Sequence, residues 1–340
     1  MSMILDRMKT VYSYYTNKHV LGNYPKLIGI ELTNHCDLEC IMCPQPDQTR
    51  NLGLMDMDLF KKIIDEVRGH SEFIYLHGLG ESLLHPKFFE MAEYANKAGL
   101  KTHLSTNLTF LNEERNEKLA KSDIDFIVLS LDGATKETYE SIRIGGDFEK
   151  SLNHIKHLLK LKKKYNAKFL IDIQFIQMEK NQHQADQIKA LFSDDEHEVI
   201  DRFRVKPAFS TTNKTVDNPL KHLVPCYYLW STMTILQDGK VSMCCMDFDG
   251  QVILGDLTKD KVYDVWNNSA MARLREKHKK LEYDSSPICD KCSVPNMGYF
   301  SNTTILASAF LSSGAMRKGL SFYESLIVEN RWGKNASGKN

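Results

Sequence analysis

The first two-thirds of the chain predicts an α/β fold built on a parallel sheet. Short apolar runs alternate there with longer segments whose apolar residues recur at helical spacing, giving six strand–helix units in about 180 residues. Parallel strands need a long crossover, usually a helix, so this alternation indicates a parallel sheet. The alternation alone is compatible with both a barrel and a doubly wound sheet.

The predicted strands are apolar or β-branched runs at 27–32, 73–76, 101–105, 125–130, 169–176 and 199–205. The predicted helices are amphipathic segments at 56–68, 86–98, 112–121, 136–164 and 182–192. Asp56 is a capping residue for the first helix, Gly99 ends the second, and Gly145 and Gly146 interrupt the long one. Residues 1–20 and 303–330 also predict helices that serve packing. If the sheet is a barrel, the first of these helices packs on it or closes its mouth. The polar tail 333–340 predicts disorder.

Composition excludes several classes of protein. The 340 residues are 42% hydrophobic and 26% charged, which is typical of globular chains. Lys+Arg and Asp+Glu are both 44, so we expect neither a nucleic acid nor an anionic membrane as partner. We see no apolar run of ~20 residues and no signal peptide, and therefore expect a cytoplasmic protein. Eight cysteines in such a chain favour metal sites over disulfides.

Three of these cysteines, Cys36, Cys40 and Cys43, lie in one short loop with C-x3-C-x2-C spacing. The loop begins four residues after the strand 27–32, where an α/β barrel carries its chemistry. Thiolates bind zinc, copper(I) or iron–sulfur clusters. Three thiolates leave one position of a four-coordinate site open. The spacing therefore favours a [4Fe–4S] cluster with one free iron, and the alternative is a zinc site completed by His35 or by a distant residue.

A three-cysteine loop after the first strand resembles the radical S-adenosylmethionine (SAM) superfamily. The resemblance implies a partial (β/α)6 TIM-like barrel and a [4Fe–4S] cluster whose free iron chelates SAM. It also implies reductive cleavage of SAM to a 5′-deoxyadenosyl radical that abstracts a hydrogen atom from a substrate. Met42 stands where the family often has an aromatic residue, and we expect it to lie against the adenine.

Residues that follow successive predicted strands match the family's SAM contacts. Gly78-Leu79-Gly80-Glu81 resembles the Gly-Gly-Glu stretch that meets the methionyl amino group, with Leu79 in place of the first glycine. The other expected contacts are Ser105 and Asn107 for the ribose, Ser130 and Asp132 after the next strand, and Arg143 for the SAM carboxylate. Each residue alone has a simpler explanation as a turn, a cap or a solvated charge. Their regular placement favours the SAM site.

A second set of cysteines lies in the last third of the chain. Segment 234–244 predicts a β-hairpin with a turn at Asp238 and Gly239. Four cysteines around it suffice for a second [4Fe–4S] cluster or a zinc site: Cys226, Cys244, Cys289 and Cys292. Their spacing resembles the auxiliary-cluster extension called SPASM. No cysteine follows Cys292, so the extension resembles the shortened "twitch" form with one auxiliary cluster.

The resemblance suggests four parts: an N-terminal helical extension (1–24), a radical SAM partial barrel (25–215), a twitch domain (216–300) and a C-terminal helix with its tail (301–340). Only about 25 residues precede the first strand, so we expect no peptide-recognition domain and a small polar substrate, sugar- or cyclitol-like. The expected reaction is a dehydrogenase-type oxidation of an alcohol to a ketone. Alternatives are an epimerase or dehydratase, a peptide maturase, and a zinc-binding scaffold.

Three residues are candidates for the chemistry after hydrogen abstraction. Cys245, beside Cys244, is left without a cluster to bind, and it is either a passive neighbour or a hydrogen donor. Arg204 and Lys206 leave the strand 199–205 toward the expected barrel mouth and are candidate bases by position. We expect a reducing electron donor such as flavodoxin or ferredoxin as a protein partner.

Overall fold

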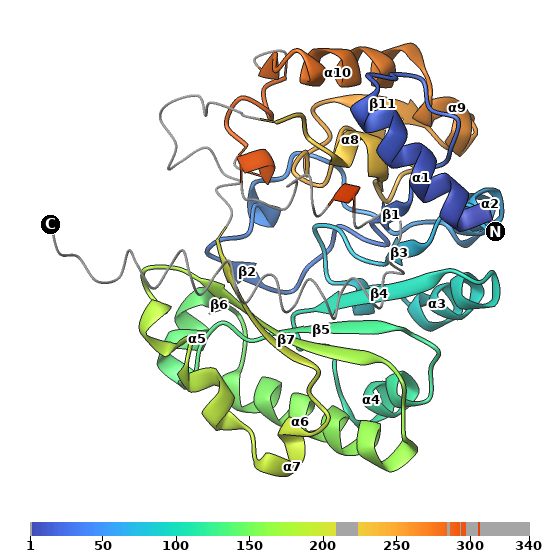
Figure 1. The fold of residues 1–340 in the computed structure, drawn as a ribbon. Coiled ribbons are helices and arrows are strands. Elements are labelled where there is room, and N and C mark those ends of the chain that lie inside the picture. Colours follow the sequence, from blue (N-terminus) through green and yellow to red (C-terminus); the bar gives the residue numbers. More distant parts are fainter. Residues whose placement is uncertain (1, 209–223, 284–285, 293, 297–304, 307–340) are drawn as a thin grey trace, which may run out of the picture.

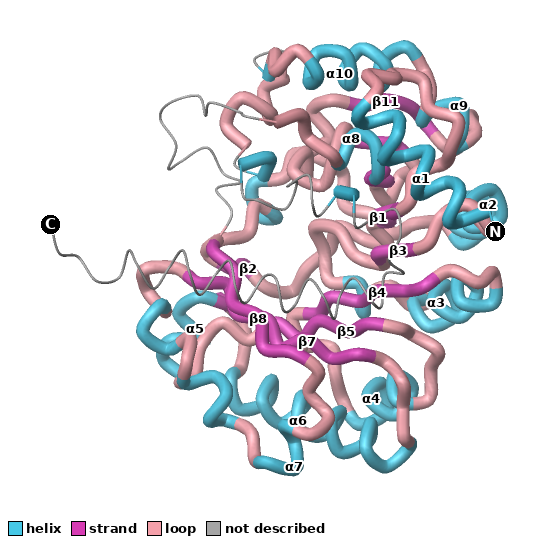
Figure 2. The backbone as a smooth tube through the Cα atoms, viewed as in Figure 1, coloured by secondary structure: helices cyan, strands magenta, loops and turns pink. Residues whose placement is uncertain are grey.

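Nine strands of the described residues form one continuous curved sheet, with helices along its outer side (Figures 1 and 2). The computed structural model describes residues 2–208, 224–283, 286–292, 294–296 and 305–306. The order of the nine strands is β11-β10-β9-β1-β3-β4-β5-β7-β8. From β1 to β8 all neighbours are parallel and follow chain order. This sequential order is that of a partial (β/α)6 barrel, not of a doubly wound sheet.

The six parallel barrel strands are β1 (Leu27–Ile30), β3 (Phe73–Tyr75), β4 (Lys101–Thr106), β5 (Phe126–Ser130), β7 (Leu170–Gln177) and β8 (Arg202–Pro207). All six strands predicted from sequence are therefore present, with β8 shifted toward Pro207. A further pair, β2 (Glu39–Cys40) and β6 (Arg143–Ile144), forms a small antiparallel sheet that the sequence did not reveal.

The helices between the strands also follow prediction, with one exception. They are α2 (Met57–Val67), α3 (Phe88–Lys97), α4 (Glu113–Ala120), α5 (Lys136–Ile142), α6 (Phe148–Tyr165) and α7 (Asp194–His197), with 3-10 turns η1 (Gln45–Asp47), η2 (Ser82–Leu84), η3 (Gln182–Gln184) and η4 (Gln187–Leu191). Asp56 caps α2 by accepting from two backbone N–H groups, and Gly99 follows α3 with a φ of +82°. The predicted interruption at Gly145 separates α5 from α6.

The predicted helix 182–192 is wrong, because the segment forms η3 and η4 instead. Two buried side chains tie it to the loop after β5 and to the helix α5 that follows this loop. Asn181 donates to the Asp132 carbonyl at 2.9 Å, and Gln184 donates to Thr138 at 2.9 Å. These bonds compete with a continuous helical ladder and leave only short turns.

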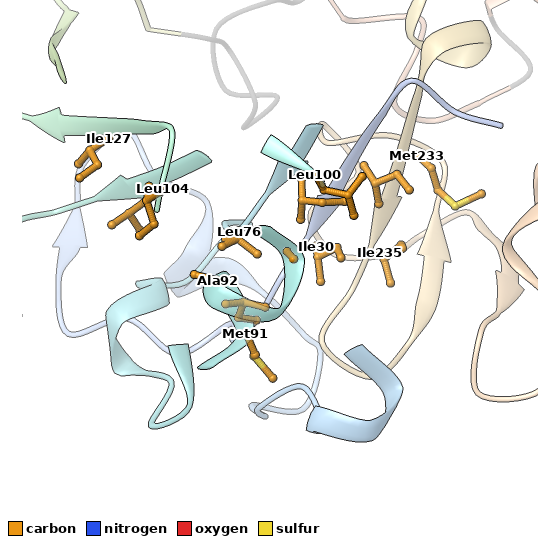
Figure 3. Close-up of a cluster of buried hydrophobic side chains, with 14 of the residues drawn as sticks. Ile30, Leu76, Met91, Ala92, Leu100, Leu104, Ile127, Met233 and Ile235 are labelled. Atoms are coloured by element: carbon orange, nitrogen blue, oxygen red, sulfur yellow. The ribbon is translucent and has the colours of Figure 1, made fainter. Parts of the chain in front are cut away.

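The core lies between the sheet and the helices. Figure 3 shows Ile30, Leu104 and Ile127 of the barrel strands packed with Met91 of α3 and Met233 of the added strand β9, all 0–1% exposed. Successive residues of a strand point to opposite faces. The residues next to these in each strand therefore point to the inner face of the barrel.

The last third of the chain extends the barrel sheet. Strand β9 (Thr232–Ile235) pairs parallel to β1, and β10 (Lys240–Ser242) and β11 (Ile253–Asp256) follow antiparallel. The β9–β10 hairpin was predicted, and its Gly239 has a φ of +87°, which favours glycine. Pairing of β9 with β1 was not predicted. The remaining helical elements are α8 (Tyr228–Ser231), α9 (Val262–Trp266), α10 (Ser269–Lys279) and η6 (Val294–Asn296).

The N-terminal helix α1 (Ser2–Tyr15) packs at the end of the barrel away from the cysteine loop. Its Arg7 pairs with Glu72, directly before β3, at 2.8 Å, and its Tyr14 hydroxyl donates to the Pro225 carbonyl at 3.0 Å. Helix α1 is therefore a packing element and not a cover over the mouth. The predicted segment 303–330, except for 305–306, and the tail 333–340 lie outside the described residues. Across the part of the chain that is described, no helix is long and apolar enough to cross a membrane.

A buried ion pair, Glu31–Arg50, joins the barrel to the last third of the chain. Arg50 Nη1 and Nη2 lie 2.7 and 3.0 Å from the two Glu31 oxygens. The same carboxylate accepts from the backbone N–H of Leu79 at 3.1 Å and of Gln237 at 3.4 Å. Glu31 is 3% exposed, so its charge depends on these four contacts.

We expect Arg50→Ala to lower the free energy of unfolding by about 3 kcal/mol, because it leaves a buried carboxylate without its counter-charge. The double variant Glu31→Gln, Arg50→Ala should lose less than the sum of the single variants. Denaturant unfolding of the cluster-free protein measures both. Lys118→Ala, which removes an exposed partner of Glu114, is the control and should change stability by less than about 0.5 kcal/mol. Strict additivity of the two buried changes would contradict the coupling.

Candidate active site at the carboxyl ends of the strands

The three-cysteine loop lies at the carboxyl end of β1, held against the segment that follows β5. Cys40 stands opposite Arg143 in the β2–β6 pair, and the Ile41 N–H donates to the Ile142 carbonyl at 3.0 Å. Burial raises the pKa of Cys36 and of Cys40 to about 11, and the neighbouring thiols of the loop add to the effect. The structure thus brings Cys36, Cys40 and Cys43 together, which fits three sulfur ligands for one cluster.

Asn107, which follows β4, contacts the first of these thiols. Its Nδ2 donates to Cys36 Sγ at 3.6 Å and to Asp37 Oδ1 at 2.9 Å. Its Oδ1 accepts from the Thr109 hydroxyl at 2.6 Å. The predicted ribose contact therefore lies beside the cysteine loop, with its amide already engaged there.

Asp132 and Arg143 form a buried pair next to the second thiol. Arg143 Nε and Nη2 donate to Asp132 Oδ2 at 2.8 and 2.6 Å, and Arg143 Nη1 lies 3.9 Å from Cys40 Sγ. The other oxygen of Asp132 accepts from the Ile176 N–H at 2.6 Å. Both residues were predicted to contact SAM, and the structure places both at the cysteine loop.

The Gly78–Glu81 stretch packs tightly on the end of β1. A Cβ on Gly80 would lie 2.4 Å from the His35 carbonyl oxygen, and one on Gly78 would lie 2.6 Å from the Glu31 side chain. Glycine is needed at both positions because these close approaches leave no room for a side chain.

Glu81 is buried, and its carboxylate accepts three hydrogen bonds from the protein. The donors are the N–H groups of Asn107 and Leu83, at 2.7 and 3.0 Å, and the Thr106 hydroxyl, at 3.1 Å. Burial raises the pKa of Glu81 to about 7. The carboxylate predicted for the SAM ammonium thus connects the end of β3 to the end of β4 in this structure.

Three other residues were predicted to contact SAM. Ser105 and Ser130 stand in β4 and at the end of β5, on the inner face opposite the core residues. Met42 is half-buried between Cys40 and Cys43. Their contacts with SAM stay predictions.

The second set of cysteines surrounds one pocket. Cys226, Cys244, Cys289 and Cys292 all line it, together with apolar and aromatic side chains, and it holds about 370 Å³ of space that includes an opening to solvent. Burial raises the pKa of Cys289 to about 12 and also raises that of the other three thiols. Four thiols around one pocket fit a sulfur-ligated cluster. Cys245 is not among its lining residues.

Cys245 is exposed and directly follows the pocket-lining Cys244. Crowding of its thiol by protein atoms raises its pKa to about 11, while the nearby Lys206 ammonium acts in the opposite direction. Two of the candidate chemical residues, Cys245 and Lys206, therefore interact electrostatically.

Arg204 does not fit the role of a base. It pairs with the Asp172 carboxylate of β7, as does Arg202 at 2.6 Å, and a guanidinium stays protonated in proteins. In the strand register Arg204 stands beside Gln174, which stands beside Ser130. Arg204 therefore shares a row of the inner face with a predicted SAM contact.

Within the described ranges, no three His, Cys, Asp or Glu side chains are placed to hold a single metal ion. Burial raises the pKa of the thiols at both sites and so favours their protonated form, and a metal centre would displace their protons on binding. Assignment of the two sites to clusters therefore depends on the gathered thiols and on the family of the chain.

A parallel α/β barrel with three cysteines after its first strand defines a class of iron–sulfur enzymes. Residues 30–174 match the Radical SAM superfamily, and residues 226–293 match SPASM, an iron–sulfur cluster-binding domain. The chain belongs to the radical SAM superfamily of enzymes and carries a C-terminal SPASM domain.

Curated relatives match over part of their length. AdoMet-dependent heme synthase of Methanosarcina barkeri is 38% identical over 142 residues, 41% of each chain. The tungsten-containing aldehyde ferredoxin oxidoreductase cofactor-modifying protein of Pyrococcus furiosus is 37% identical over 109 residues, 32% of this chain and 31% of that protein. Mycofactocin maturase MftC of Mycobacterium tuberculosis is 32% identical over 39% of this chain and 34% of its own. The matched segments thus span less than half of each relative.

Solved structures share the fold. BtrN in complex with AdoMet and 2-DOIA has a TM-score of 0.54 at 17% identity, covering 78% of this chain and 92% of its own. Streptococcus suis SuiB bound to S-adenosylmethionine has a TM-score of 0.61 at 15% identity, covering 79% and 71%. Native anSMEcpe with bound AdoMet has a TM-score of 0.56 at 15% identity, covering 90% and 99%. At these identities the likeness supports the barrel fold.

Sequence reasoning missed the residues that hold the site together. Glu31, Arg50 and Gln237 were not singled out, although Glu31 stands inside an apolar strand, where a charge requires a partner. A charged residue inside an apolar run could therefore have predicted a buried ion pair at Glu31. The opposition of Cys40 to Arg143 left no such signal, because it depends on pairing between segments about 100 residues apart.

The raised pKa of Glu81 predicts a pH dependence. In the unfolded chain this carboxyl ionises near pH 4.5 and in the folded protein near pH 7, so between these values the folded state binds more protons. Stability of the cluster-free protein should therefore fall as pH rises through this window, by up to about 1.4 kcal/mol per pH unit. Urea unfolding of wild type and Glu81→Gln across pH 4.5–8 measures the effect. The difference between the two should change within the window and level off above it; equal slopes would refute the shift.

Proposed function

We propose that this enzyme cleaves SAM reductively and oxidises an alcohol of a small polar substrate, sugar- or cyclitol-like, to a ketone. The observation that carries the proposal is the pair of thiol sites: three cysteines at the barrel mouth and four around a separate pocket. When bound, two [4Fe–4S] clusters and SAM supply the 5′-deoxyadenosyl radical that removes a hydrogen atom from the substrate, and an acceptor for the electron that leaves it.

The chain's own residues would hold these groups. Cys36, Cys40 and Cys43 bind the SAM cluster, and Cys226, Cys244, Cys289 and Cys292 bind the auxiliary one. The SAM molecule would lie over the carboxyl ends of the strands, against the Gly78–Gly80 backbone, Ser105, Ser130 and Met42. Asn107, Asp132 and Arg143 border the same space. Glu81 holds the end of β4 in place beside this space through its hydrogen bonds to Thr106 and Asn107. We propose a low-potential protein such as flavodoxin or ferredoxin as electron donor.

Lys206 lies in β8, and its charge acts on Cys245, which follows the pocket-lining Cys244. A proton must leave the substrate hydroxyl as the ketone forms, and Lys206 is the candidate acceptor once it has lost its own proton and is a neutral amine. Arg204, paired with Asp172, would instead orient the substrate from the same strand. If Cys245 donated a hydrogen atom to the substrate radical, the reaction would be an epimerisation without net oxidation.

A second candidate function is modification of a larger substrate, as in a maturase. It is favoured by the 32–38% identity to a heme synthase, a cofactor-modifying protein and a mycofactocin maturase. The SAM chemistry would be the same in either case. Only the inner-face residues that meet the substrate would serve a different purpose.

Replacing Cys36, Cys40 and Cys43 together by alanine should abolish 5′-deoxyadenosine formation and remove about four irons per chain, because the SAM-binding cluster loses its ligands. Cys289→Ala, Cys292→Ala is the matched control: it should still cleave SAM but give no oxidised product. Anaerobic iron and sulfide analysis and chromatography of the nucleoside are the measurements. Reductive SAM cleavage by the triple variant, or stoichiometric zinc without sulfide, would contradict the proposal.

Reaction in heavy water separates oxidation from epimerisation. We expect the oxidised product to be two mass units lighter than the substrate, with one SAM consumed per turnover. Hydrogen donation by Cys245 would instead add one mass unit from solvent deuterium, and Cys245→Ala would then turn over poorly. Mass spectrometry of the product decides, and a gain of one unit would rule out the dehydrogenase.

A further inference from the structure

Asn107 and Arg143 each direct a hydrogen-bond donor at a sulfur atom of the three-cysteine loop. The contacts are Asn107 Nδ2 to Cys36 Sγ, at 3.6 Å, and Arg143 Nη1 to Cys40 Sγ, at 3.9 Å. We propose that these two are positioning residues that hold the loop in its ligating shape and raise the reduction potential of the cluster bound there. This inference rests on the proposed assignment of the loop to a [4Fe–4S] cluster.

The direction of the Asn107 amide is set by its neighbours. Its backbone N–H donates to the buried Glu81 carboxylate at 2.7 Å, and its Oδ1 accepts from both the N–H and the hydroxyl of Thr109, at 3.0 and 2.6 Å. With the oxygen held on that side, the NH2 group faces Cys36 and Asp37. The donor is therefore oriented before any cluster binds.

The guanidinium of Arg143 is oriented by a buried ion pair. Two of its nitrogens bind Asp132, which is 0% exposed and is itself held by the Ile176 N–H. The Arg143 backbone lies directly opposite Cys40 in the β2–β6 pair. Nε and Nη2 both donate to Asp132 Oδ2, which leaves Nη1 on the side of the thiol.

Backbone N–H groups act on thiols at both sites, and at the three-cysteine loop those of Leu38 and Gln45 reach Cys36 and Cys43. The auxiliary pocket differs in its side-chain donors. Backbone N–H groups of Tyr228, Met246 and Val294 reach Cys226, Cys244 and Cys292. The Ser286 hydroxyl reaches Cys289. Among the described residues, Arg143 is thus the charged donor at a ligand sulfur. Hydrogen bonds to cluster sulfurs favour the reduced state, because that state carries one more negative charge.

The test is a potentiometric titration of the reconstituted, SAM-free holoenzyme, followed by electron paramagnetic resonance. The relevant signal is the one that changes when SAM is then added to a parallel sample. In Asn107→Ala, the ratio of reduced to oxidised cluster at a fixed potential should fall about tenfold, which is about 59 mV for one electron. Iron release from this cluster to a chelator should also be faster by about tenfold.

Two further variants keep the test independent of misfolding. Asn107→Asp keeps the shape and the contact to Thr109 but replaces the donor by a charge, so its potential should fall further. Arg143→Lys keeps a positive charge but cannot bind Asp132 with two nitrogens and also reach Cys40, so its potential should fall as well. Asn96→Ala is the control, because this amide bonds Asp125 at the opposite end of β4; it should lower the melting temperature and leave the potential unchanged.

The outcomes separate this inference from the proposed function. A wild-type protein that forms no SAM-responsive cluster overturns both. A normal cluster whose potential and iron release are the same in wild type, Asn107→Asp and Arg143→Lys overturns the positioning role and leaves the cluster site intact.

Discussion

One buried carboxylate, that of Glu31, determines how the loops at the barrel mouth are arranged. It accepts from Arg50 after the cysteine loop, from the Leu79 backbone after β3, and from the Gln237 backbone of the β9–β10 hairpin. Segments from three distant parts of the chain therefore meet at two oxygen atoms. The need for glycine at position 78 follows from the same residue, because any Cβ there would collide with the Glu31 side chain.

The polar residues around the cysteine loop form a network that exists without a cofactor. Glu81 holds the end of β4, Asn107 at that end reaches Cys36, and Asp132 orients Arg143 toward Cys40. These are largely the residues that the family resemblance assigns to SAM. Their hydrogen bonds to the protein show that they also shape the space that SAM would enter. A site prearranged in this way spends less free energy on ordering when its cofactor binds.

The barrel could be read from the sequence because its signals are local. Apolar runs, a capping Asp56 and a terminating Gly99 each act within a few residues, and the structure confirms them. The failures involve partners that are distant in the chain. Asn181 and Gln184 break a predicted helix through bonds to the loop after β5 and to α5, and Arg143 acquires its position by pairing with Cys40. Spacing identified both cysteine sets, but only tertiary structure showed which groups face their sulfurs.

The parallel pairing of β9 with β1 joins two strands that lie far apart in the sequence, and this affects the order in which the sheet can form. β1 is made early, yet its partner on one side, β9, is about 200 residues further along. Until then one edge of β1 is an unpaired apolar strand, the kind of edge that templates aggregation. During synthesis this edge of β1 therefore stays without its partner strand until β9 has been made. A fragment ending after β8 would keep that edge permanently open, so the barrel and its iron–sulfur extension are best regarded as a single folding unit.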